Sequence, residues 1–400
     1  MRRFPLLVKV VSLAAVLLVL MMGLSMIGGL ASERMTYRAQ ASASIESSLS
    51  GAQTLAGMVL TRRCIETFAR TVVNDKEKTI ERSEVLTVLR SLPQSSSWTT
   101  ESRIEPRYRG LYKVNSYALN ADEVADWRTM KDLTAMSLKA PAVAVRCDAP
   151  LIEFTVSDPR GIRAVSLRGP NGDLEVKASS NGGTFHRGFE AKLPVADNAL
   201  DAPMRLRLAV ELVGIESVGF VPLAVDNTVA LKSDWPHPSF SGEFLPLTRT
   251  VTARGFDARW SVSSLAAQAR SQLGSNAAGC AQGRSTAKGC LQSFGVDFID
   301  PVNPASLSDR ATKYGILFIV LTFAGIVLLE VLKGQAVHPV QYLLIGAAMA
   351  VFFLLLLSLS EHVEFIRAYV AAALACVTLL TVYAKAVLGG WQRALPMSAG

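Results

Sequence analysis

The residues best suited to chemistry lie in one short segment, residues 233–246, which is rich in proline and aromatic side chains. Asp234, His237 and Glu243 combine two carboxylates with an imidazole, the side chains that hold a metal ion or form an acid–base set. The prolines and large aromatic residues instead favour a rigid, packed turn in which His237 is hydrogen-bonded. We expect the structural turn and keep the chemical site as its alternative.

The rest of the chain shows no catalytic signature. It contains no G-x-S-x-G, H-E-x-x-H, Walker-type glycine loop or dinucleotide fingerprint, and only four histidines. We therefore expect no catalytic residue, metal or cofactor, and a binding protein rather than an enzyme. The net charge of +8 comes from scattered basic residues without a basic patch interleaved with aromatics, so nucleic acid is excluded as a partner.

Three ionisable residues at the ends of apolar runs, Glu330, Glu361 and His362, are the second group of candidates. Ionisable groups at membrane depth are costly and often functional. At the end of a span, however, a long side chain can reach water and simply anchor the helix. We expect anchoring, and the alternative is a membrane-embedded transporter or enzyme that uses the region of Glu361 and His362.

Cysteine usage fits an oxidising compartment. Cys376 lies inside an apolar run, and the even number of other cysteines permits pairing. Cys280 and Cys290 bracket a flexible loop rich in glycine, alanine and polar residues, so they are a candidate disulfide. The alternative is that they are two unrelated thiols.

Four long apolar runs decide the class of protein. They cover residues 6–30, 314–332, 340–359 and 365–387, and each is long enough as a helix to cross a hydrocarbon core of about 30 Å. A cleaved signal peptide is the alternative for the first run, which is longer than a usual leader. We predict a transmembrane signal anchor (residues 1–31), a periplasmic β-rich domain (32–313), a three-helix transmembrane region (314–391) and a cytoplasmic tail (392–400).

The flanking charges predict the orientation. Arg2, Arg3, Lys333, Lys385 and Arg393 gather at the N-terminus, after the second run and at the C-terminus. Short basic loops stay on the cytoplasmic side, so the long segment between the first two runs is expected in the periplasm. The lipid bilayer is therefore a partner, and other envelope proteins are further candidates.

The segment between the first two runs carries strand signals. Residues 204–212 alternate apolar and polar side chains, residues 151–156 are β-branched and aromatic, and residues 250–261 alternate again. Helical patterning is confined to residues 120–135 and 263–272. These patterns predict an α+β membrane protein with a sandwich-like, β-rich domain and one N-terminal and three C-terminal transmembrane helices.

Several motifs resemble one family. The segment Asp234-Trp-Pro-His-Pro-Ser-Phe with Gly242-Glu-Phe-Leu-Pro is similar to the CreD family of bacterial inner-membrane proteins. Weaker similarity covers Ser50-Gly51, residues 109–112 and residues 157–162. The C-terminal matches are Asp309-Arg-Ala-Thr-Lys-Tyr-Gly, Glu330, His338-Pro339, Gln341-Tyr342-Leu-Leu and the run 354–362.

The resemblance implies an inner-membrane protein of a Gram-negative bacterium, linked to cell-envelope integrity and to a carbon-source-responsive regulon, with no established biochemical activity. Three features depart from the family. Met58 stands where members tend to have proline, and residues 303–306 lack the usual aromatic–glutamine step. Members also tend to carry two further spans after the fourth.

Overall fold

The computed structural model describes residues 4–388 except 75–76, 111, 136–143, 180–187, 275–289, 299, 301–303, 334–336 and 361. The chain divides into two compact units. The helix unit comprises Met1–Ala41 and Asp300–Gly400, and the sheet unit comprises Ser42–Ile299.

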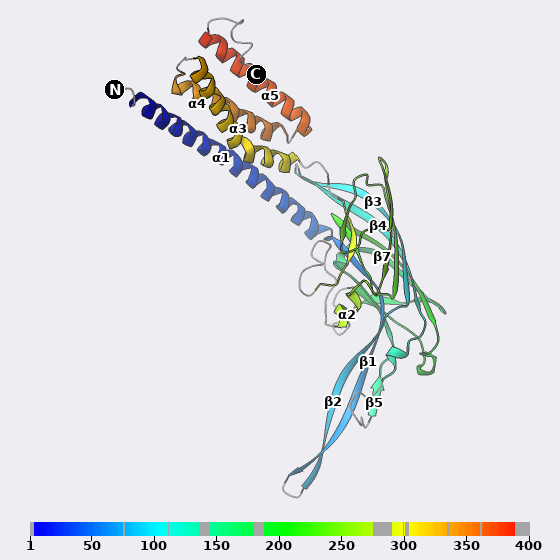
Figure 1. The fold of residues 1–400 in the computed structure, drawn as a ribbon. Coiled ribbons are helices and arrows are strands. Elements are labelled where there is room, and N and C mark those ends of the chain that lie inside the picture. The colour runs from blue at the N-terminus through cyan, green and yellow to red at the C-terminus, as the bar shows by residue number, and fades with distance from the viewer. Residues whose placement is uncertain are drawn as a thin grey trace. The chain divides into compact units, whose positions relative to one another are not determined.

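The helix unit holds four helices that are long and apolar enough to cross a membrane, among the residues that the structure describes. They are α1 (Phe4–Ser48), α3 (Pro304–Lys333), α4 (Pro339–Leu359) and α5 (Phe365–Leu388) (Figure 1). The prediction of one N-terminal and three C-terminal transmembrane helices is confirmed. At 1.5 Å per residue, the 45 residues of α1 are about twice as long as a hydrocarbon core is thick.

Small residues set the contacts between these helices. A Cβ atom added at Gly346 of α4 would lie 2.2 Å from Leu20 Cδ1 of α1. Ala368 and Ala372 of α5 are fully buried and pack with Leu356 of α4. Close backbone approach is what such residues permit between membrane helices.

The sheet unit contains two sheets, whose strands are nearly all paired antiparallel. In the first, the order is β14-β17-β12-β1-β6-β10-β9, with β2 and β5 also paired to β1. In the second, it is β15-β16-β13-β3-β4-β11-β7-β8. The bounds are β1 Gln53–Asn74, β2 Glu77–Ser91, β3 Ser95–Arg109, β4 Tyr112–Trp127, β5 Ala144–Cys147, β6 Leu151–Val156, β7 Ile162–Gly169, β8 Gly172–Leu174, β9 Val176–Ala178, β10 Gly188–Lys192, β11 Met204–Ile215, β12 Ser217–Val221, β13 Asp226–Ser233, β14 Ser239–Gly242, β15 Thr248–Thr252, β16 Gly255–Ser263 and β17 Phe294–Asp297.

The core lies between the two sheets. Trp98 of β3 contacts Phe154 of β6 and Phe220 of β12, with ring centroids 6.1 and 5.7 Å apart. Trp260 of β16 lies 5.8 Å from Phe294 of β17 in the same way. Since each pair joins one sheet to the other, the unit is a sandwich, as the sequence predicts. A short helix, α2 (Ala269–Gly274), covers part of the outer face of the first sheet with Leu273.

Two sequence-based expectations for this unit need correction. Residues 120–127, expected to be helical, belong to β4, where burial alternates from one residue to the next. The acidic and alanine residues of this segment conceal its period because a glutamate, Glu123, occupies one of the buried positions. Residues 250–261 form not one strand but parts of β15 and β16, which pair across the turn at residues 253–254.

The strands β1 and β2 form a long ribbon. Their ladder runs from Leu60 opposite Ser91 to Asn74 opposite Glu77, and Figure 1 shows it extending away from the rest of the unit. The short strand β5 adds a third strand, and a disulfide joins Cys64 of β1 to Cys147 of β5 at directly opposed positions. The even cysteine count permitted such a bond, but it did not identify the pair.

Candidate functional site

The three residues of the polar–aromatic segment do not converge. Asp234 Oδ1 accepts a hydrogen bond from the backbone N–H of Ile104 (2.9 Å), and the carboxylate of Glu243 accepts one from the amide of Gln292. The backbone carbonyl of His237 accepts from the indole N–H of Trp235 (2.8 Å), and the two rings meet edge to face. Each of the three candidates is exposed and serves a separate local contact.

The segment is thus a packed turn. The ring of Phe240 stacks edge to face on Phe256 and Trp260, and the indole N–H of Trp260 donates to the carbonyl of Phe244 (3.2 Å). Across the described part of the chain, no group of three or more histidine, cysteine, aspartate or glutamate side chains could hold a metal ion. These contacts favour the structural interpretation of the segment.

Glu330 lies at a meeting point of three helices in the helix unit. Its carboxylate forms an ion pair with Lys9 of α1 and accepts a hydrogen bond from the hydroxyl of Tyr342 on α4 (3.1 Å). Tyr342 lies in the first turn of α4, which begins with a capping box formed by His338 and Gln341 and with Pro339 as the first helical residue. The sequence picked out Glu330 but not Lys9 as its partner.

The other membrane candidates are less informative. His362 is exposed, with its backbone N–H bonded to the carbonyl of Leu359 (3.0 Å). Glu361 lies outside the described residues, so the role of this pair stays a prediction. Cys280 lies outside them too. Cys290 is disulfide-bonded, and its pairing with Cys280 stays a prediction.

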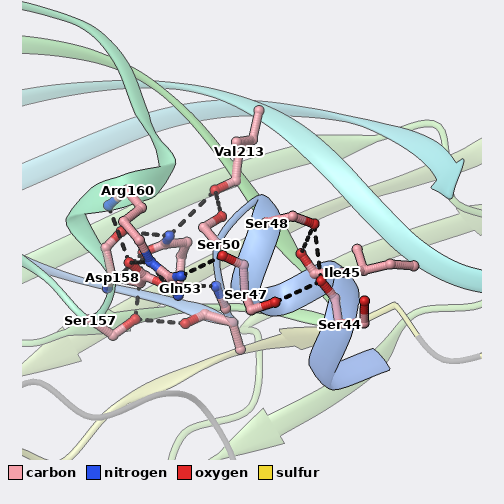
Figure 2. Close-up of polar contacts among 12 residues, drawn as sticks. Ser44, Ile45, Ser47, Ser48, Ser50, Gln53, Ser157, Asp158, Arg160 and Val213 are labelled. Carbon is pink, nitrogen blue, oxygen red and sulfur yellow. Dashed lines mark hydrogen bonds and ion pairs between the residues drawn. The ribbon is translucent and has the colours of Figure 1, made fainter. Parts of the chain in front are cut away.

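A dense polar network lies where α1 ends in the sheet unit, and we call it the junction (residues 47–53, 157–161 and 213; Figure 2). The carboxylate of Asp158 accepts hydrogen bonds from the backbone N–H of Gly51 (2.9 Å) and from the guanidinium of Arg160 (2.5 Å). Arg160 also donates to the carbonyl of Ser47 in the last turn of α1 (2.9 Å). A cation at the C-terminus of a helix satisfies its free carbonyls and its dipole.

Gln53 connects the junction to both sheets. Its amide nitrogen donates to the carbonyls of Asp158 (2.9 Å) and of Val213 on β11 (3.3 Å), and its oxygen accepts from the N–H of Asp158 (3.3 Å). Ser50 Oγ donates to the same carbonyl of Val213 (2.7 Å). Gly161 is required by close approach, since a Cβ there would lie 2.3 Å from that carbonyl oxygen.

Electrostatics favour a charged Asp158. Burial, the largest single influence, acts to raise its pKa, but the hydrogen bonds from Arg160 and Gly51 together outweigh it and hold the pKa below the usual range. The polar groups described at the junction bond to one another. The arrangement is suited to fastening the end of α1 onto the sandwich rather than to catalysis. Sequence reasoning missed the junction as a site, although two of its three parts, at Ser50-Gly51 and at residues 157–161, carry the weaker family resemblance.

A second carboxylate, Glu123 of β4, lies in the interior of the sandwich, 1% exposed. It accepts hydrogen bonds from Ser96 Oγ (2.7 Å) and from the backbone N–H of Met58 (3.1 Å), which lies at an irregularity in the pairing of β1 with β6. Burial raises the pKa of Glu123 to about 7, against the opposing influence of these two hydrogen bonds. A Cβ atom added at Gly57 would lie 2.5 Å from Oε1 of Glu123, so the carboxyl group packs directly against the backbone of this glycine.

Comparison with known proteins adds the family. A crystal structure of an M1 zinc metallopeptidase mutant from Deinococcus radiodurans matches with a TM-score of 0.23 and 11% sequence identity. The match covers 42% of this chain and 38% of the metallopeptidase chain, and it is too distant to support an argument. The inner membrane protein CreD of Escherichia coli (strain K12) is 33% identical over 393 residues, which cover 98% of this chain and 83% of the relative. The family model for inner membrane protein CreD matches residues 5–400. With its N-terminal helix, its β-sandwich and its three C-terminal helices, this chain belongs to the CreD family of inner membrane proteins.

Proposed function

We propose that this protein maintains the integrity of the cell envelope by binding through its sheet unit, which faces the periplasm, and not by catalysis. The observation that carries the proposal is the insertion of a large sandwich between candidate membrane helices that precede and follow it in the sequence. This connectivity keeps a broad protein surface at the membrane. The resemblance in sequence to an envelope-integrity family points the same way.

The chemistry of the described polar residues supports binding over catalysis. Asp234, His237 and Glu243 each serve a separate structural bond, whereas a catalytic set needs a nucleophile, a base and an orienting group in mutual contact. The carboxylates of Asp158 and Glu123 likewise accept hydrogen bonds from backbone N–H groups and from neighbouring side chains of the same unit. Folding, and the surface that it presents, would account for these side chains.

A complementation experiment tests the proposal. A deletion strain should be more sensitive to detergents or wall-active antibiotics, and the full chain should restore resistance. The triple variant Asp234→Asn, His237→Gln, Glu243→Gln should also restore it, because the amide oxygens can still accept the bonds from Ile104 and Gln292. Gly161→Ala, which clashes with backbone at the junction, should fail through misfolding and serves as the negative control. Failure of a triple variant that is stable and correctly inserted would instead establish a chemical site.

The orientation is tested separately by labelling with an impermeant thiol reagent in a Cys376→Ser background. Leu265 is 97% exposed in the sheet unit, so the Leu265→Cys variant should react in intact spheroplasts. Gln335→Cys, placed in the short connection after α3, should react only after the membrane is opened. The opposite pattern would place the sheet unit in the cytoplasm and contradict the proposal.

A further inference from the structure

The hairpin between β3 and β4 continues past the core of the sandwich. Along β3, burial alternates as far as Ser102, and from Glu105 to Arg109 every side chain is exposed. The two strands stay paired throughout, down to Arg109 opposite Tyr112. On the opposite strand, Tyr112 and Lys113 are half-buried and burial resumes at Val114. The side chains that remain available to a partner are therefore those at the β3 side of the hairpin, Glu105 to Arg109. We call residues 103–110, 112 and 113 the tip hairpin.

The tip hairpin is strongly cationic. Its sequence contains Arg103, Arg107, Arg109 and Lys113 against a single carboxylate, Glu105. Glu105 forms an exposed ion pair with Arg107 (3.0 Å), which is worth little in water and leaves a net positive tip. The charge complement of this surface is therefore an anion.

Aromatic rings accompany the cations. Tyr108 is 65% exposed at the tip, and Tyr112 follows on the other strand. The ammonium group of Lys113 lies 5.7 Å from the ring of Trp235, while Asp234 bonds the backbone of β3 at Ile104 (2.9 Å). The packed turn at 234–237 thus supports the base of the hairpin. Ile104 and Lys113 at the base of the hairpin thus contact Asp234 and Trp235, which belong to a family-like motif far away in the sequence.

Tyrosines flanked by arginines are typical of segments that lie at lipid headgroups. There the aromatic ring contacts the apolar side of the interface while the charged group contacts water and phosphate. Each arginine or lysine near an anionic membrane contributes a similar increment of attraction. A standard protein interface uses about 20–30 residues on each side, which is more than the tip hairpin contains. Because membrane helices precede and follow the sheet unit in the sequence, a bilayer is always close to it.

We propose that the tip hairpin docks the sheet unit onto anionic phospholipid headgroups of the membrane in which the protein is anchored. The contact is electrostatic, with Arg107, Arg109 and the neighbouring cations on phosphate groups and Tyr108 at headgroup level. This inference deepens the proposed function, since it names one surface and its ligand. Docking in a purified system and complementation in cells are independent measurements, so either can fail without the other.

The test uses the full chain in nanodiscs. A spin label is attached to the Pro106→Cys variant in a Cys376→Ser background, and its accessibility to a water-soluble nickel chelate is compared with its accessibility to oxygen. In phosphatidylcholine containing phosphatidylglycerol, the label should be shielded from nickel. In phosphatidylcholine alone, or at high salt, which screens exposed charges, it should stay accessible.

Charge variants make the test specific. Arg107→Gln with Arg109→Gln should lower the ratio of docked to undocked protein by about five-fold for each arginine removed. The matched control is Arg168→Gln with Arg207→Gln, which removes the same charge from a cross-strand pair at the other end of the same sheet. The control should leave docking unchanged. The proposal would be overturned if the label were shielded from nickel equally with and without phosphatidylglycerol, or equally with and without the tip arginines. It would also be overturned if shielding appeared only when other envelope proteins were added.

Discussion

The two ends of α1 are held by carboxylates in different ways. In the helix unit, Glu330 pairs with Lys9 and Tyr342, and the side chain of the glutamate is 11% exposed. In the sheet unit, Asp158 binds Arg160, which reaches the last turn of the same helix, and the arginine side chain is 53% exposed. One pair joins helix to helix, and the other joins a helix terminus to a turn of the sandwich.

The difference lies in what surrounds each charge. Among apolar helices, little water is available to solvate a charge that has lost its partner. Removing one member of the ion pair therefore leaves the other as an uncompensated charge. At the junction, water can solvate Arg160 if Asp158 is lost, because the guanidinium of Arg160 is exposed. The same pairing of charges therefore carries a larger penalty for disruption in the helix unit.

A third carboxylate sharpens the contrast. Glu123 is more deeply buried than Glu330 or Asp158, and its described partners are neutral donors, Ser96 and Met58. Burial disfavours the charged form of Glu123 and raises its pKa to about 7, against the hydrogen bonds from these neutral donors, whereas the hydrogen bonds from Arg160 and Gly51 lower the pKa of Asp158 despite its burial. The environment of each carboxylate, and not its residue type, decides its charge.

The largest expected effect concerns Glu123. Its pKa is raised, so the native state holds a proton that the unfolded state releases, and the free energy of unfolding should fall as the pH rises from about 4.5 through 7. The decrease should be on the order of 3 kcal/mol. Glu123→Gln should remove this dependence and be more stable than the native chain at pH 8. Urea denaturation of the full chain in micelles, followed by tryptophan fluorescence, measures it, and equal slopes for both proteins would contradict the assignment.

Loss of Lys9 should have the next largest effect. Lys9→Met leaves the carboxylate of Glu330 without its cation, which should cost about 2–3 kcal/mol of helix-unit stability. The double variant Lys9→Met with Glu330→Gln should recover most of the loss, because no charge then remains unpaired. Thermal unfolding in detergent, run as a double-mutant cycle, gives the coupling. Additive losses would mean that the two side chains do not interact.

Asp158→Asn should have a smaller effect, about 2 kcal/mol at neutral pH, since a charge-assisted bond to Arg160 and part of the bond to Gly51 are lost. The pKa of Asp158 is lowered, so its contribution is present above its unfolded value of 3.8 and is lost as the pH falls through the native value. The difference between native chain and variant should therefore shrink below pH 4. A difference that is constant with pH would show that the charge is not involved.

Arg160→Gln should have the smallest effect on the free energy of unfolding, because the guanidinium is exposed and the backbone N–H of Gly51 still donates to Asp158. Hydrogen exchange of the last turn of α1 is the sensitive measurement. Residues 45–49 should exchange faster in the variant, while the sandwich core stays protected. Unchanged exchange there would show that the bond from Arg160 to Ser47 does not hold the helix end.

Local patterns predicted much of this molecule. Residues 151–156 form β6 with the predicted bounds, residues 204–212 lie within β11, and the four apolar runs lie within α1, α3, α4 and α5. Each of these signals depends on the period or length of an apolar pattern within one element. Where a polar residue occupies a buried position, as Glu123 does in β4, the pattern predicts a helix although the structure has a strand.

The sequence by itself therefore determined the class of protein, the number of candidate membrane helices and the β-rich character of the segment between them. Only the tertiary structure decided which charges meet. It brings Lys9 to Glu330 across 321 positions of sequence, Gly51 to Asp158 across 107, and Trp235 to the tip hairpin. The physical reason is that hydrophobic periodicity is local, whereas an ion pair or a buried hydrogen bond is chosen by the fold that places its partners.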